Sequence, residues 1–124
     1  MHLIIGGAYQ GKKTFAKEKY GFRNIHMFIC MKDEIDFSYP CVANFEVFTY
    51  GCVERGEDPV EYFKLHRDEW EDAVLICRDI SAGMVPVNAT ERKWRECHGK
   101  LCQYLSKEAS QVSRIFCGLE QRLK

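Results

Sequence analysis

The N-terminal segment places a short apolar run directly before a glycine-rich stretch and a run of helix-forming residues. Residues 2–5 suit a buried strand, and residues 12–20 contain mostly good helix formers before Gly21. Between them lies Gly6-Gly7-Ala8-Tyr9-Gln10-Gly11-Lys12-Lys13, which matches the phosphate-binding pattern G-x-x-x-x-G-K-[ST] except at its last place. A strand, a glycine-rich loop and a helix in this order predict an α/β fold with a phosphate site where the helix begins.

The loop predicts nucleotide binding, with one departure from the pattern. We expect the backbone amides of residues 9–12 to surround a phosphate and Lys12 to reach the terminal phosphates. Lys13 replaces the hydroxyl residue that usually coordinates Mg²⁺, and Thr14 lies one residue later, ~100° further around the helix. A register that begins at Gly7 restores a Lys-Thr pair but puts Lys12 where glycine is wanted, so we prefer the first register.

The predicted nucleotide-binding residues are Gly6, Gly7, Ala8, Tyr9, Gln10, Gly11, Lys12, Lys13 and Thr14. The alternative is an ordinary glycine-rich turn with exposed lysines.

Further predicted strands and helices alternate along the chain. Residues 24–30, 73–77 and 112–117 are predicted strands, and 119–123 a short edge strand. One helix is expected from Asp58-Pro59 to about residue 70, and another after an Asn88 cap. Residues 32–56 fit either a strand or an irregular helix. This order predicts a three-layer, P-loop NTPase-like α/β fold of reduced size, with a mostly parallel sheet and helices on both faces.

Length and charge narrow the function classes. With 124 residues, the chain is expected to form a single domain, residues 1–124. Its 18 basic and 18 acidic residues cancel, which argues against binding to nucleic acid or to an anionic membrane. No apolar run approaches the ~20 residues that span a bilayer, and no signal pattern begins the chain, so we expect a cytoplasmic protein. Near-zero net charge and several aromatic residues permit a homo-oligomer.

The seven cysteines are an odd number and form no C-x-x-C pair, so reduced thiols are predicted rather than a disulfide framework. Cys97, His98 and Cys102 are potential metal ligands. However, Cys97 and His98 project ~100° apart on one helix, and no second ligand pair is evident, so core packing is favoured.

Asp79 follows the predicted strand 73–77. Ligands of a parallel sheet gather at the carboxyl ends of its strands, so we expect Asp79 to face the glycine-rich loop and to act as the Mg²⁺ carboxylate. A turn-forming or helix-capping role is the alternative reading of this residue.

Two segments resemble the adenosylcobinamide kinase/adenosylcobinamide-phosphate guanylyltransferase family. Leu3-Ile4-Ile5-Gly6-Gly7-Ala8-x-x-Gly11-Lys12 is similar to the family's apolar strand and G-G-A-x-S-G-K-S loop. The segment from Ala73 to Pro86 resembles its apolar strand, Asn-Glu-Val and Gly-x-Gly-Ile-Val-Pro loop. The resemblance extends over the first thirty or so residues and over everything from about residue 73.

The resemblance implies phosphoryl transfer from ATP or GTP to a corrinoid hydroxyl in cobalamin biosynthesis. By position, Lys12 would hold the donor phosphates and Asp79 would replace the family's glutamate. The family's guanylyl-accepting histidine falls in a stretch that is shortened here, and neither His26 nor His66 lies at the matching place. We therefore expect guanylyl transfer to be absent. The expected ligands are a nucleoside triphosphate, Mg²⁺ and a corrinoid; the alternative is a non-catalytic nucleotide-binding or interaction protein that kept the kinase scaffold.

Overall fold

A computed structural model describes residues 1–81 and 86–124, which form a six-stranded sheet in the order β2-β3-β4-β1-β5-β6. The strands are β1 (His2–Gly6), β2 (Met27–Ile29), β3 (Cys41–Ala43), β4 (Val74–Arg78), β5 (Gln111–Phe116) and β6 (Leu119–Arg122). Neighbouring strands are parallel except for the antiparallel pair β5 and β6. The predicted α/β fold with a mostly parallel sheet is therefore confirmed.

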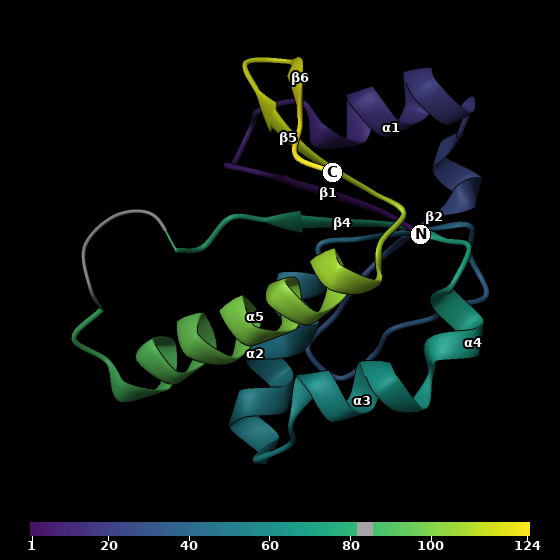
Figure 1. Cartoon of the computed structure of the whole chain (residues 1–124). Coiled ribbons are helices and arrows are strands. Elements are labelled where there is room, and N and C mark those ends of the chain that lie inside the picture. Colours follow the sequence, from purple (N-terminus) through teal and green to yellow (C-terminus); the bar gives the residue numbers. More distant parts are fainter. Residues whose placement is uncertain (82–85) are drawn as a thin grey trace.

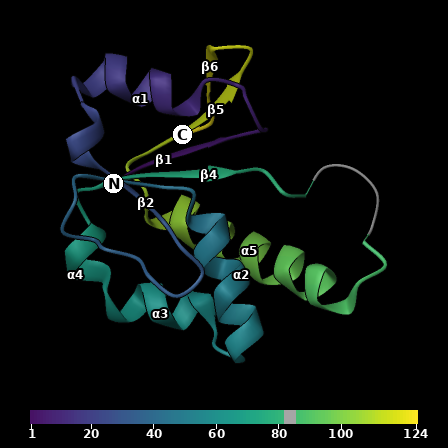
Figure 2. The same ribbon diagram turned by 180° about the vertical axis from the view of Figure 1, so that it is seen from behind.

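Helices cover both faces of the sheet, as expected. They are α1 (Lys12–Tyr20), α2 (Phe45–Arg55), α3 (Pro59–Leu65), α4 (Arg67–Trp70) and α5 (Ala89–Glu108). Helix α1 lies on one side of the sheet, and α2, α3 and α5 lie on the other, in both views (Figures 1 and 2). No helix in residues 1–81 and 86–124 is long and apolar enough to cross a bilayer.

The central strands are buried on both faces. Leu3 belongs to the core beneath α2, α3 and α5, whereas Ile4 packs with Ala16 of α1. In β4, Cys77 faces the first of these cores and Ile76 the second. Because neighbouring side chains of a strand point to opposite faces, an uninterrupted apolar run is what a doubly covered strand requires.

Two predicted elements are shorter in the structure. The strand expected over residues 24–30 contains only β2, because residues 24–26 form a 3₁₀ turn. That turn is closed when the amide of His26 donates to the Arg23 carbonyl at 2.9 Å and the amide of Arg23 donates to His26 Nδ1 at 2.8 Å. Local backbone bonds therefore replace ladder bonds at the start of the expected strand.

The helix expected from Asp58-Pro59 to about residue 70 begins as predicted, since Asp58 accepts from the Val60 amide at 2.9 Å. The prediction of one continuous helix is wrong, because α3 ends before His66 and α4 follows as a separate turn. The buried Trp70 donates from Nε1 to the Phe63 carbonyl at 2.7 Å. This side chain adds a second donor to a carbonyl at the end of α3 that also accepts from the His66 amide at 3.2 Å.

Residues 32–56, which fitted either a strand or a helix, contain both. The short strand β3 is wholly buried, and α2 follows it directly after Asn44. The second capped helix is confirmed: Asn88 Oδ1 accepts from the amides of Thr90 and Glu91 at the start of α5.

The carboxyl ends of β1 and β4, which lead into the glycine-rich loop and into Asp79, lie side by side. Gly6 at the end of β1 is paired with Arg78 at the end of β4 and with Ile115 in β5. The Asp79 amide donates to the Gly6 carbonyl at 2.9 Å, which holds the segment after β4 against the start of the loop. Residues 82–85, part of the segment matched to the family's Gly-x-Gly-Ile-Val-Pro loop, lie outside the described residues.

Candidate functional site

The loop between β1 and α1 has a tight backbone that depends on its glycines. A Cβ atom on Gly6 would lie 2.6 Å from the Ile115 carbonyl oxygen, so no larger residue fits there without movement of β5. Gly11, which precedes α1, has a φ of 91°, a conformation that glycine adopts without steric cost. Tyr9 also has a positive φ, of 59°, at the exposed tip of the loop.

Gln10 fixes the loop to the turn between β5 and β6. Its side-chain oxygen accepts from the Cys117 amide at 2.6 Å, and its carbonyl accepts from the Gly118 amide at 2.9 Å. Cys117 and Gly118 both have positive φ values, the conformation of a tight hairpin turn that matches strand twist. The loop is thus held in shape by contacts that leave its outer side open.

The start of α1 is suited to an anion. The first backbone bond of the helix runs from the Phe15 amide to the Gly11 carbonyl, so the amides of residues 12–14 have no intrahelical partner. No side chain caps this end, and the first turn carries Lys12 and Lys13 but no acidic residue. Cations at the positive end of a helix dipole are unfavourable by themselves, whereas an anion placed between them and the amides is stabilised.

Lys12 lies across the loop rather than pointing into solvent. Its Nζ donates to the Gly7 carbonyl at 2.6 Å, and the side chain is half-buried. Burial lowers the pKa of Lys12, while the neighbouring Glu46 carboxylate opposes this shift. The ammonium group is therefore held close to the loop amides.

A cavity of about 360 Å³ lies beside the loop. Its wall combines the predicted residues with three that the sequence did not indicate: Ala8, Tyr9, Gln10, Gly11, Lys12, Lys13 and Thr14 from the loop and α1, together with Asn44, Glu46 and Arg78. Gly6 and Gly7 form the start of the loop behind this wall. Three cationic side chains against one carboxylate give the cavity a positive balance that suits phosphate groups.

Glu46 is the acidic residue of this cavity, and sequence reasoning missed it. It lies in the first turn of α2 and is 7% exposed. One carboxylate oxygen, Oε1, accepts from the Arg78 amide at 3.0 Å. Glu46 stands in residues 32–56, where the sequence left the secondary structure open, and only the pairing of β3 with β4 brings it to the loop.

Asp79 follows the carboxyl end of β4, as predicted, but its side chain lines a neighbouring cavity of about 220 Å³. Its Oδ1 accepts from the Ser81 amide at 2.9 Å and from the Ser81 hydroxyl at 2.6 Å. The bond from the Ser81 hydroxyl is the main reason why the pKa of Asp79 is lowered. Arg78 borders both cavities, so Asp79 is adjacent to the loop, and its role toward Mg²⁺ stays a prediction.

No histidine is among the described residues that line the cavity beside the loop. His26 accepts from the Arg23 amide, and His66 pairs with Glu69 on the far helices. His2 lies buried between Tyr20 and Ser113.

A parallel sheet with helices on both faces, and a glycine-rich loop leading into an uncapped helix beside a basic cavity, define a small α/β protein of the P-loop-like class. The family model described as cobinamide kinase / cobinamide phosphate guanyltransferase matches residues 56–123, more than half of the chain. The chain therefore belongs to this family, which confirms the resemblance noted in the sequence. No curated protein matches the chain. The matched segment begins at Gly56, directly after α2, ends at Leu123 and contains Asp79, while the glycine-rich loop lies before it.

Proposed function

We propose that this chain is a single nucleotide-binding domain that holds ATP or GTP in the cavity beside its glycine-rich loop. The observation that carries the proposal is the combination at the start of α1: uncapped amides, Lys12 across the loop, and Lys13 and Arg78 in one basic cavity. The proposed phosphate contacts are the amides of residues 9–12 and the ammonium of Lys12. Thr14, Tyr9 and Gln10 border the same space.

The proposed reaction is transfer of the γ-phosphoryl group to a corrinoid hydroxyl in cobalamin biosynthesis, as family membership supports. The hydroxyl oxygen forms the new bond to phosphorus, the bond to the β-phosphate oxygen breaks, and the hydroxyl proton is released. Lys12 would stabilise charge on the phosphates, and such catalysis rests on positioning and charge neutralisation.

Mg²⁺ would supply further charge neutralisation between the phosphates. Hard oxygen donors are what Mg²⁺ requires, and the chain offers the carboxylates of Glu46 and Asp79 and the hydroxyl of Thr14. Asp79 is the predicted ligand, and we add Glu46 because it lines the same cavity as the loop. Lys13 supplies a positive charge where the family pattern has a hydroxyl residue, which favours weak dependence on Mg²⁺.

Guanylyl transfer is proposed to be absent, which is supported by the lack of a histidine among the described residues of the cavity. The same observation, together with Lys13, favours a second candidate: a non-catalytic protein that binds nucleotide without transferring its phosphate. A cytoplasmic location and self-association remain predictions from the sequence.

Calorimetric titration with ATP and GTP, with and without Mg²⁺, tests the proposal on the natural chain and on Lys12→Ala. We expect the natural chain to bind and Lys12→Ala to bind at least about tenfold more weakly, ~1.4 kcal/mol. No binding at millimolar nucleotide would refute the site. Phosphorylation of added cobinamide separates the kinase from the non-catalytic candidate, because only the kinase converts it.

A further inference from the structure

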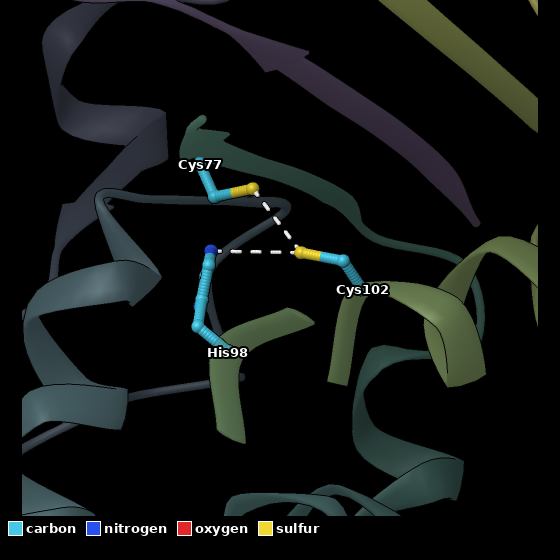
Figure 3. A group of neighbouring side chains, drawn as sticks. All are labelled: Cys77, His98 and Cys102. Atoms are coloured by element: carbon cyan, nitrogen blue, oxygen red, sulfur yellow. Dashed lines mark hydrogen bonds between the residues drawn. The ribbon is translucent and has the colours of Figure 1, made fainter. Parts of the chain in front are cut away.

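A second group of reactive side chains lies away from the loop, between β4 and α5. Cys77 is fully buried, His98 is 3% exposed, and Cys102 is half-buried. Figure 3 shows the three side chains converging from the strand and from one face of the helix. His98 and Cys102 are four residues apart, so they lie on the same side of α5, whereas Cys97 lies outside the group.

Two of the three distances within the group are close to those of a tetrahedral zinc site. Cys77 Sγ and Cys102 Sγ are 3.9 Å apart, and Cys102 Sγ is 3.5 Å from His98 Nε2. Zinc bonds of about 2.3 Å to sulfur and about 2.0–2.1 Å to nitrogen place two sulfurs about 3.8 Å apart, and a sulfur and a nitrogen about 3.6 Å apart. All three potential ligand atoms lie within 4.8 Å of one another. The remaining pair, Cys77 Sγ and His98 Nε2, would close by up to about 1.2 Å on binding.

The partners of His98 orient its ring so that Nε2 faces the other two potential ligands. Thr49 donates its hydroxyl hydrogen to the Glu46 carbonyl at 2.8 Å, so it can only accept from His98 Nδ1, 3.1 Å away. Nδ1 of His98 therefore carries a hydrogen that it donates to Thr49, and Nε2 faces the sulfur of Cys102. Metal-binding histidines are held in this way by an outer partner that fixes the ring and its tautomer.

The group also opens toward solvent on one side. His98 and Cys102 line the cavity of about 220 Å³ that also contains Asp79. A water molecule occupies about 30 Å³ of liquid, so the cavity has room for an ion to enter and for a fourth ligand.

We propose that Cys77, His98 and Cys102 form a site for Zn²⁺, with the fourth position facing the cavity that contains Asp79. Two sulfur ligands and an imidazole select a borderline-soft ion such as Zn²⁺ over Mg²⁺. The ion would join the end of β4 to the middle of α5. Its ligand in β4, Cys77, lies two residues before Asp79. None of the three proposed ligands lines the proposed nucleotide cavity, and the metal site does not depend on nucleotide binding.

Titration of the fully reduced, metal-free chain with Co²⁺, followed by competition with Zn²⁺, tests this site. Co²⁺ reports a tetrahedral site through strong visible bands and thiolate ligands through a near-ultraviolet charge-transfer band. We expect one Co²⁺ per chain, displaced by Zn²⁺, and an increase in the thermal unfolding midpoint on addition of Zn²⁺. Absence of the thiolate band would overturn the proposal.

Cys102→Ser and His98→Gln are the test variants, and Cys97→Ser is the matched control on the same helix. Loss of a ligand should weaken Co²⁺ binding by more than about 100-fold, beyond the ~10–100-fold that loss of an outer partner causes. Cys97→Ser should keep the spectrum and the affinity of the natural chain; equal loss in this control would refute the assignment. Circular dichroism identifies a variant that does not fold, and Cys102→Ala then replaces it.

Oxidation of Cys77 and Cys102 to a disulfide is the remaining outcome that would decide against the zinc site. The two sulfurs are close enough that a Cys77–Cys102 disulfide is the competing use of this pair. If mass spectrometry finds that disulfide in the isolated chain, and the reduced chain still binds no Co²⁺, the pair is a thiol–disulfide pair and the zinc proposal fails.

Discussion

Glu46 at the start of α2 accepts a 3.0 Å hydrogen bond from the backbone amide of Arg78 at the end of β4. This contact joins two segments that are 32 residues apart in the chain, at the wall of the cavity that contains the loop. The Glu46 carboxylate therefore has two separable roles. One of its oxygens satisfies a backbone amide, and its charge lies beside the proposed phosphates.

Substitutions of Glu46 separate these two properties. Glu46→Gln keeps an acceptor for the Arg78 amide, so the free energy of unfolding should change little, while Mg²⁺ should no longer strengthen nucleotide binding. Glu46→Ala leaves the amide unsatisfied and should cost about 1–3 kcal/mol of stability. Chemical denaturation and calorimetry measure the two effects. Asp79→Asn is the comparison: if it alone abolishes the Mg²⁺ effect, Asp79 is the metal ligand and Glu46 is not.

Lys13→Thr restores the hydroxyl that the loop pattern usually has after its lysine. We expect the variant to bind nucleotide at least about tenfold more tightly with Mg²⁺ than without it, ~1.4 kcal/mol, because a hydroxyl can coordinate the ion and an ammonium cannot. Lys13→Ala controls for the loss of charge. If both variants respond equally to Mg²⁺, the hydroxyl has no part in metal binding.

Gly6→Ala tests the close packing behind the loop. The added Cβ would meet the Ile115 carbonyl oxygen at 2.6 Å, so β5 must move, and we expect a loss of about 1–3 kcal/mol in the free energy of unfolding. Gly99→Ala is the control, because a Cβ there meets nothing within 4 Å inside α5. It should stabilise the chain by about 0.5–1 kcal/mol. Equal stability of the two variants would contradict the packing argument.

The buried environment of His2 predicts that the folded chain loses stability in mild acid. Burial is the largest cause that lowers the pKa of His2, to about 4. The Ser113 hydroxyl donates to Glu120 at 2.6 Å, so His2 Nε2 donates to Ser113 at 2.7 Å. The unfolded chain takes up this proton near pH 6.5 and the folded chain only near pH 4, so the stabilising contribution is complete above pH 6.5 and is lost as the pH falls toward 4.

The size of that loss is on the order of 2 kcal/mol, measured as the free energy of unfolding between pH 7 and pH 4.5. His2→Gln carries no titrating group and should show a flatter profile over the same range. An identical profile in both chains would assign the acid sensitivity to other groups.

Much of the fold follows from local sequence signals. The apolar run before Gly6, the helix after Gly11 and the Asn88 cap all lie where their residues predicted them. Local signals failed where distant residues decided the backbone. The break between α3 and α4 at His66, with the buried Trp70 bonded back to the Phe63 carbonyl, is predicted by no feature of residues 59–70.

The sequence by itself determined the α/β class, the family resemblance and the glycine-rich loop, because strand runs, caps and glycine positions act through neighbours along the chain. Only the tertiary structure decided which acid shares a cavity with Lys12, since Glu46 reaches it through the pairing of β3 with β4. Only the tertiary structure likewise brought Cys77, His98 and Cys102 together. The sequence offered Cys97, His98 and Cys102 as potential ligands but favoured core packing, and only the packing of α5 on β4 brings Cys77 to His98 and Cys102.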